Sequence, residues 1–298
     1  MNTFHKVIFG SCKDMHEVRD NSIHLVITSP PYYNAPYDYP NLFENYEGFL
    51  HLILDLAKEL HRVVAKGRIV CFVTDDMLVE GVKYPIVSDI TSIMRKEGFR
   101  YRDKIMWVKP KGYSRISRRS GLVVKHPYPM YFYPDNVQES ILIFQKGKFD
   151  YQYMKTLPAD VKKDSSIDLS EYNKKNWNLS VWNITNVLPY KNRLEVGIAA
   201  FPEEIPVRLI RLFSFKGETV LDPFLGSGTT SKVARDLGRS TIGYEIDPEL
   251  KPIILRKLDH GGARGNKLRT LQRADVMTLR KSMLNRVNAR KSVTKRKS

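Results

Sequence analysis

The chain has 298 residues, with 49 lysines and arginines against 32 aspartates and glutamates, which gives a formal net charge of +17. A hydrophobic content of 42% is ordinary for a folded protein and excludes wholesale disorder. The apolar runs are too short to cross a bilayer, the first residues carry no signal-peptide pattern, and only two cysteines, Cys12 and Cys71, are present. We therefore expect a cytoplasmic protein without membrane contact, and the positive charge favours a polyanion as its partner.

The positive charge is concentrated near the end of the chain. Residues 264–298 contain 12 lysines and arginines and one acid, Asp275. We treat 261–298 as a basic C-terminal extension, for which a solvated segment and a polyanion-binding segment are both open.

Short apolar runs alternate with amphipathic stretches over the first hundred residues, a pattern typical of a parallel sheet covered by helices. Strands are predicted over 7–9 and 23–28, then a helix over 49–64 that Gly67 ends, then a strand over 68–73. The further predicted elements are a helix over 86–97, strands over 104–108 and 140–145, a helix over 205–213, a strand over 219–221, a helix over 230–237 and a strand over 241–244.

Residues from about 110 to 197 have irregular periodicity and are rich in Tyr, Asn, Lys and Ser. We therefore predict one α/β domain built from 1–110 and 197–260, with an inserted region over 111–196. The strand near 140–146 could belong to either part.

A glycine turn follows the strand over 219–221, in the string Asp222-Pro223-Phe224-Leu225-Gly226-Ser227-Gly228-Thr229-Thr230. Gly226 and Gly228 allow backbone to approach a ligand closely at the carboxyl edge of a sheet. Glu245 ends the next strand, where a carboxylate can accept hydrogen bonds from ribose hydroxyls. A P-loop would need Lys where Thr229 stands, and a dinucleotide fold would need a third Gly where Ser231 stands.

A second loop follows the strand over 23–28 and reads Ser29-Pro30-Pro31-Tyr32. Two prolines remove two N–H donors, so the loop offers carbonyl acceptors suited to an exocyclic amine. Tyr32 supplies a flat face on which an extruded base could stack. A plain Ser-Pro-Pro turn beside buried tyrosines is the structural alternative.

The two loops together resemble those of DNA amino-methyltransferases that act on cytosine N4 or adenine N6. Thr28–Tyr32 is similar to their catalytic motif, and Asp222–Thr230 to their S-adenosylmethionine motif. The catalytic motif comes first, as in the permuted β group. The resemblance implies a Rossmann-like methyltransferase sheet with helices on both faces and an inserted, irregular target-recognition region.

The resemblance also implies roles for individual residues. Ser29, Pro30, Pro31 and Tyr32 would be catalytic, and Asp222, Pro223, Phe224, Gly226, Ser227, Gly228, Thr229, Thr230, Glu245, Phe201, Pro202 and Ser11 would bind the cofactor. Ser11 departs from the family, which commonly has Asp after the glycine equivalent to Gly10, and Gly197 stands where many members have His. In this family, a serine at the motif position of Ser29 is associated more often with methylation of cytosine N4 than of adenine N6.

Lys109, Lys111, Arg115, Arg118, Arg119 and Lys125 lie in a stretch without an acid. A basic loop beside the active-site edge suits phosphate contacts, whereas a solvated surface loop is the alternative. The loop over 34–46 could close over the site, or its aromatic side chains could pack against the body.

We therefore expect a site-specific DNA methyltransferase that uses S-adenosylmethionine, most simply on cytosine N4 and in a restriction-modification system. Double-stranded DNA and a cognate restriction endonuclease would be partners, no metal site is expected, and monomer and homodimer stay open. Adenine N6 methylation, RNA or protein-amide methylation and a non-catalytic DNA-binding module are the alternatives.

Overall fold

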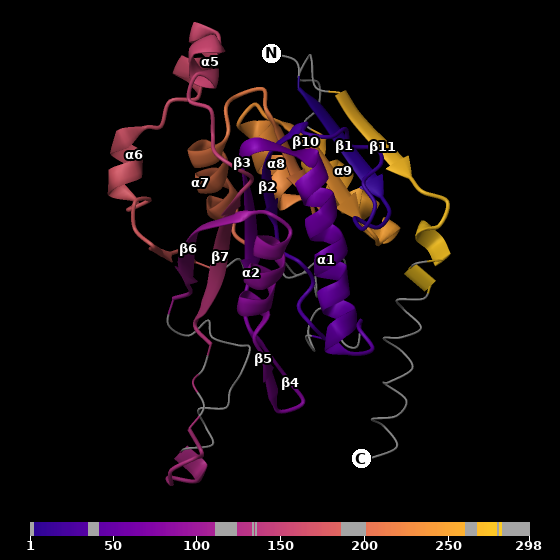
Figure 1. The fold of residues 1–298 in the computed structure, drawn as a ribbon, viewed down its shortest axis with the longest axis vertical. Helices are drawn as coiled ribbons and strands as arrows, with labels where there is room; N and C mark the ends of the chain where they lie inside the picture. Colours follow the sequence, from indigo (N-terminus) through magenta and orange to yellow (C-terminus); the bar gives the residue numbers. More distant parts are fainter. Residues whose placement is uncertain are drawn as a thin grey trace.

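The computed structural model describes residues 3–34, 42–110, 124–132, 134, 136–185, 201–259, 267–278 and 280–281. Within these residues nine strands form one sheet, with a separate hairpin (Figure 1). The sheet strands are β1 (Phe4–Phe9), β2 (Ile23–Thr28), β3 (Val64–Thr74), β6 (Arg100–Val108), β7 (Gln138–Gln145), β8 (Val181–Asn183), β9 (Thr219–Asp222), β10 (Ser240–Glu245) and β11 (Lys267–Gln272), and the hairpin is β4 (Met77–Val79) with β5 (Val82–Tyr84). The helices are α1 (Tyr46–Val63), α2 (Ile86–Lys96), α4 (Tyr153–Thr156), α5 (Ala159–Asp164), α6 (Leu169–Lys174), α7 (Glu204–Phe213), α8 (Thr229–Asp236), the short 3-10 helix η1 (Pro248–Leu250) and α9 (Lys251–Leu258).

The strand order is β11-β1-β10-β9-β2-β3-β7-β6-β8. All pairs from β11 to β3 are parallel, whereas β7 runs antiparallel to both β3 and β6. The parallel strands bring the ends of β2, β9 and β10 to one edge, which is where ligands bind in open α/β sheets. The α/β class and the central, mostly parallel sheet are therefore confirmed.

Helices cover both faces of the sheet, because the strands are apolar on both sides. In β2, Val26 packs in the cluster with α1 and α2, whereas Leu25 and Ile27 pack in the cluster with α7 and α8. Figure 1 shows α1 and α2 in front of the sheet and α7, α8 and α9 behind it. No described helix is both long and apolar enough to traverse a bilayer.

Helix α1 begins at a side-chain cap and ends earlier than the sequence suggested. The Asn45 side chain accepts a hydrogen bond from the Gly48 N–H at 2.9 Å. The helix ends at Val63 and β3 starts at the next residue, so the prediction that Gly67 ends the helix was wrong. Gly67 instead lies inside β3 with φ +84°, where an added Cβ would stand 2.5 Å from the Phe149 Cα.

Part of the predicted insertion belongs to the sheet itself. Strand β7 lies between β3 and β6, with Phe72 opposite Leu142, and β8 extends the sheet beyond β6. The segment between β7 and β8 carries only the short helices α4, α5 and α6. The region 111–196 therefore contributes two strands to the sheet, β7 and the edge strand β8. Only β7 has an apolar run that could be recognised in the sequence.

The C-terminal segment is more integrated into the fold than a solvated extension. Strand β11 pairs in parallel with β1 at the sheet edge. Arg273 donates to both Glu17 carboxylate oxygens, at 2.8 and 2.6 Å, and at 3.0 Å to the Ser11 carbonyl. Arg280 lies 2.9 Å from Asp247. The described residues 267–278 and 280–281 are therefore attached to the fold through β11 and these two arginines, although most of their side chains are exposed.

Candidate active site

The two loops singled out in the sequence meet at one edge of the sheet. Because β2 and β9 are neighbours, Thr28 and Asp222 end side by side. The Thr28 hydroxyl donates to the Asp222 Oδ1 at 2.8 Å, and the Phe224 N–H donates to the Thr28 Oγ1 at 3.3 Å and to the Asp222 Oδ1 at 3.1 Å. A buried hydrogen-bond network therefore joins the glycine turn, residues 223–228, to the Pro-Pro loop, residues 29–32.

The glycine turn is held by hydrogen bonds from its backbone to the end of β10. Gly226 has φ +53° and Gly228 φ +88°, conformations that favour glycine. The Gly226 N–H donates to the Glu245 Oε2 at 2.8 Å, and the Leu225 N–H donates to the Tyr244 carbonyl at 2.8 Å. Gly228 is followed directly by α8, and buried Ser227 accepts from the Lys257 Nζ at 2.6 Å. The turn thus fixes backbone at the start of a helix next to a buried acid.

Two carboxyl groups flank this turn, and both are buried. Burial raises the pKa of Asp222 to about 7, against the hydrogen bond from Thr28. Burial likewise raises the pKa of Glu245 to about 7, although the Asp247 and Gly226 N–H groups act in the opposite direction. Each carboxylate keeps lone pairs that its present donors do not use. The edge therefore holds two acceptors that a ligand with hydroxyl or ammonium donors would stabilise in their ionised form.

Tyr32 is fixed by residues far away in the sequence. Its hydroxyl donates to the Glu139 Oε2 at 2.7 Å, and Glu139, the second residue of β7, also pairs with Lys109. The Lys109 ammonium lies 5.1 Å from the centroid of the Trp107 ring. Tyr32, Glu139 and Lys109 are all buried. This buried triad sets the orientation of the Tyr32 ring.

The rest of the Pro-Pro loop lies against an aromatic cluster. Ser29 and Pro31 are partly exposed, whereas Pro30 is buried. The Tyr33 ring lies 5.1 Å from Tyr46 and 4.7 Å from Tyr84, both edge-on. Phe43 is buried and packs edge-on against Phe49 at 5.4 Å. Phe43 and Tyr46 thus pack against the body, while Tyr37 and Tyr39 of the proposed closing loop lie outside the described residues.

Comparison with known proteins identifies the family. Residues 23–256 match the model of the N6/N4 DNA methylase family. The chain belongs to this family. It is 37% identical over 289 residues to the Type II methyltransferase M.MjaI of Methanocaldococcus jannaschii, across 87% of this chain and 92% of that protein. It is 32% identical over 284 residues to the Type II methyltransferase M.MthZI of Methanothermobacter thermautotrophicus, across 87% of this chain and 78% of the relative.

Solved structures show the same architecture as this methylase. A putative DNA modification methylase from Thermus thermophilus, solved in complex with S-adenosyl-L-methionine, superposes with a TM-score of 0.69 at 26% identity. The superposition covers 91% of this chain and 99% of the Thermus chain. The expected family and fold are therefore confirmed.

The predicted phosphate-binding residues of this methylase differ in their exposure to solvent. Lys109 is buried and paired with Glu139, so it does not lie on the exposed basic loop where the sequence suggested it. Lys125 is exposed. Lys111, Arg115, Arg118 and Arg119 lie outside the described residues. Spacing alone could not separate Lys109 from its neighbours, because its partner lies on another strand.

Three further cofactor candidates flank the edge. The Gly10 N–H donates to the Glu245 carbonyl at 2.9 Å, which sets Ser11 beside the end of β10. Phe201 packs partly buried against the cluster under α7, and the Pro202 carbonyl accepts from the Ile205 N–H at 3.0 Å. Ser11 therefore lies next to the end of β10, and the Phe201-Pro202 segment leads into α7.

Sequence reasoning did not identify Glu139 and Asp75 as site residues. Asp75 follows β3, accepts a hydrogen bond from the Asn136 side chain, and has its pKa raised chiefly by burial, with the nearby Glu139 charge adding to the shift. Glu139 lies near the start of β7 and Asp75 directly after β3. Neither belongs to a sequence motif that distinguishes it from an ordinary polar residue at a strand end. The described residues contain no group of three His, Cys, Asp or Glu side chains suited to a metal ion.

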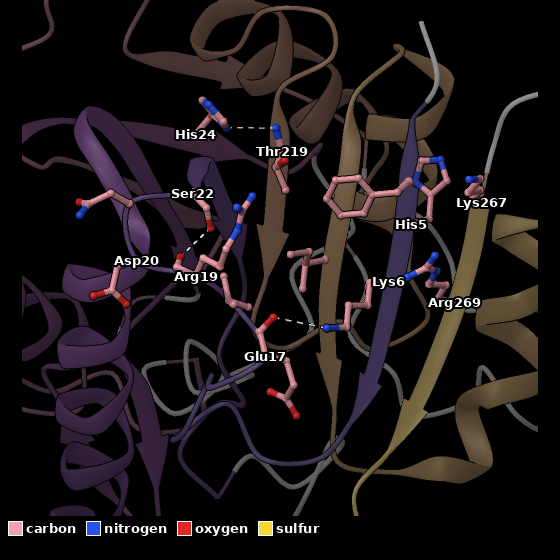
Figure 2. Close-up of a pocket in the computed structure, with 14 residues that line it drawn as sticks. His5, Lys6, Glu17, Arg19, Asp20, Ser22, His24, Thr219, Lys267 and Arg269 are labelled. Atoms are coloured by element: carbon pink, nitrogen blue, oxygen red, sulfur yellow. Dashed lines mark hydrogen bonds between the residues drawn. The ribbon is translucent and has the colours of Figure 1, made fainter.

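A cavity of about 770 Å³ lies at the opposite edge of the sheet (Figure 2). It is lined by the first residues of several strands, including Phe4, Thr219 and Lys267. The Thr219 N–H donates to the His24 Nδ1 at 3.3 Å, and Lys6 donates to the Glu17 carbonyl at 3.3 Å. The cavity is therefore remote from the two loops, at the amino ends of the strands, and is not the candidate active site.

Proposed function

We propose that this DNA methylase uses S-adenosylmethionine to methylate the exocyclic amine of a base extruded from duplex DNA, at cytosine N4 within a specific sequence. The observation that carries the proposal is the hydrogen bond between Thr28 and Asp222, which joins the Pro-Pro loop to the glycine turn. Methyl transfer needs the two reactants side by side, and this contact brings both candidate binding loops to one place.

The residues at the glycine turn fit such a cofactor. S-adenosylmethionine supplies a methyl group on a positively charged sulfur, together with ribose hydroxyls and an ammonium group. Glu245 would accept from the ribose hydroxyls, and the buried Asp222 would add negative charge near a cationic ligand. The glycine turn would allow close backbone approach, and the segment around Phe201 and Pro202 would line the methionine end. The complex of the Thermus relative with S-adenosyl-L-methionine supports this assignment.

The Pro-Pro loop fits an amine acceptor. Neither Pro30 nor Pro31 has an N–H, so carbonyl oxygens and the Ser29 hydroxyl face the reacting amine as acceptors. Acceptors aimed at the two N–H groups favour a pyramidal nitrogen with an available lone pair. Tyr32 would stack on the base, an interaction worth about 1–3 kcal/mol. Water and the Ser29 hydroxyl both remain candidates for removing the amine proton.

Ser29 supports cytosine as the target base. In the adenine-methylating members of the family, the motif position of Ser29 is more often Asp. A serine hydroxyl is a neutral hydrogen-bond acceptor and is therefore weaker than an aspartate carboxylate. The Type II names of the two relatives support a place in a restriction-modification system, with a cognate endonuclease as partner. Within this proposal, parts of 111–196 outside the sheet strands select the sequence, while 1–110 and 197–260 hold the chemistry.

The test is methyl transfer from tritiated S-adenosylmethionine to unmethylated plasmid DNA, followed by mass spectrometry of the digested nucleosides. We expect N4-methylcytosine, and methylation-aware sequencing of DNA from an expressing host should show one recurrent site. N6-methyladenine would overturn the base assignment but not the reaction. Cofactor binding without any transfer to DNA would contradict the proposed function.

A further inference from the structure

An unusually apolar surface lies on one projecting segment of the chain, residues 124–132, which we call the aromatic arm. Met130 is 91% exposed, Phe132 72% and Tyr128 67%. Large apolar side chains gathered on an exposed segment mark an interaction surface more often than chance. Figure 1 shows this segment, at the low end of the view, beyond the sheet.

The arm has a defined local conformation. The Tyr128 N–H donates to the His126 carbonyl at 2.8 Å, and the His126 and Tyr131 rings lie 5.1 Å apart. Pro127 and Pro129 restrict the backbone between them, and Met130 has φ +76°. Such a prearranged segment loses little conformational entropy when it inserts into a partner.

The arm is rooted beside the Pro-Pro loop. It leads into β7, where the Lys109 N–H donates to the Val137 carbonyl at 2.9 Å. The next residues include Glu139, which accepts the Tyr32 hydroxyl and pairs with Lys109. The root of the arm and the proposed base-stacking tyrosine therefore share one buried hydrogen-bond network.

The charge of the neighbouring sequence selects the partner. The stretch 111–125 contains five lysines and arginines and no acid. A basic stretch of this kind is complementary to a phosphate backbone and would repel a second copy of the same surface. Apolar side chains beside such a stretch match proteins that insert wedges between base steps, for which Phe, Met and Pro are typical residues.

We propose that the aromatic arm inserts Tyr128, Met130 and Phe132 into duplex DNA and occupies the space that the extruded target base vacates. This inference rests on the proposed function, because it assigns the arm to the same extrusion step. Unpairing and unstacking a base costs a few kcal/mol, and apolar contacts in the vacated space would offset part of that free energy. The arm would thus favour the extruded state while the Tyr32 ring receives the base.

The experiment uses the full chain with Tyr128, Met130 and Phe132 each changed to Ser. These side chains are exposed, so we expect an unchanged melting temperature and unchanged S-adenosylmethionine affinity by calorimetry. The substrate is a short synthetic duplex carrying the site found by methylation-aware sequencing. We expect its affinity and its kcat/KM to fall by at least about tenfold, equivalent to about 1.4 kcal/mol. Met277→Ser is the matched control, because Met277 is 55% exposed in the C-terminal segment, outside the region 111–196, and should leave both values unchanged.

A duplex with a mismatched partner opposite the target base provides the decisive comparison. Its base is already unpaired, so the triple variant should lose less than about threefold on it. An equal loss on matched and mismatched duplexes would overturn insertion, as would no loss on either. A change from dimer to monomer in the triple variant, measured by sedimentation, would assign the arm to a second copy and contradict the inference. Absence of methyl transfer by the unaltered protein would instead count against the proposed function.

Discussion

The glycine turn and the Pro-Pro loop lie at the same sheet edge, but they are held in different ways. The turn is fixed through its backbone by the neighbouring strand β10, since the Gly226 N–H donates to Glu245 and the Leu225 N–H donates to Tyr244. The Pro-Pro loop depends on remote partners, with Thr28 bonded to Asp222 and Tyr32 bonded to Glu139. The backbone of the glycine turn is thus positioned mainly by the next strand along the chain, whereas the orientation of the Tyr32 ring needs groups from more distant strands.

Removing the remote support of Tyr32 should produce the largest effect. Glu139→Gln leaves the buried Lys109 ammonium without its carboxylate, which we expect to lower the free energy of unfolding by about 3 kcal/mol. Chemical denaturation would measure it. The double variant Glu139→Gln/Lys109→Met removes both charges and should recover most of the loss. A single variant as stable as the unaltered protein would show that the triad does not support the loop.

Tyr32 itself should affect catalysis more than cofactor binding. Tyr32→Ala removes the stacking face, so we expect kcat/KM on DNA to fall by about 10- to 100-fold, from about 1–3 kcal/mol of stacking. S-adenosylmethionine affinity, measured by calorimetry, should remain within about twofold because the glycine turn has its own supports. Tyr32→Phe keeps the ring and separates stacking from the hydroxyl contact with Glu139. Near-normal methylation by Tyr32→Ala would remove the ring from the mechanism.

The glycine turn should respond to pH. Burial raises the pKa of Asp222 and of Glu245 to about 7, from ordinary values of 3.8 and 4.5. Cofactor donors bind the ionised carboxyls, so affinity should rise with pH up to about 7, by as much as about tenfold per unit for each carboxyl that ionises on binding. Over the same range the ligand-free protein should lose stability, because the folded state binds more protons than the unfolded chain. Glu245→Gln should flatten the pH dependence of affinity in calorimetric titrations, and an unchanged slope would contradict the role of Glu245.

Much of the fold followed from periodicity, but the sheet edges did not. Strand β2 was predicted at its observed bounds, and α2, α7 and α8 within one or two residues. Strand β11 was missed, because its residues are almost all exposed and its charge suggested a solvated tail. Gly67 was misread as a helix end because a bulge in β3 and a helix end both use glycine at positive φ.

The sequence by itself determined the central strands of the sheet, the glycine turn and the Pro-Pro loop, because hydrophobic periodicity and turn chemistry act over short distances along the chain. Only the tertiary structure decided that Lys109 is buried against Glu139 rather than exposed to DNA, and that Arg273 binds Glu17 rather than a phosphate. The physical reason is that a charged side chain takes its role from the partner it meets. That partner is fixed by strand order, which brings together residues far apart in the sequence.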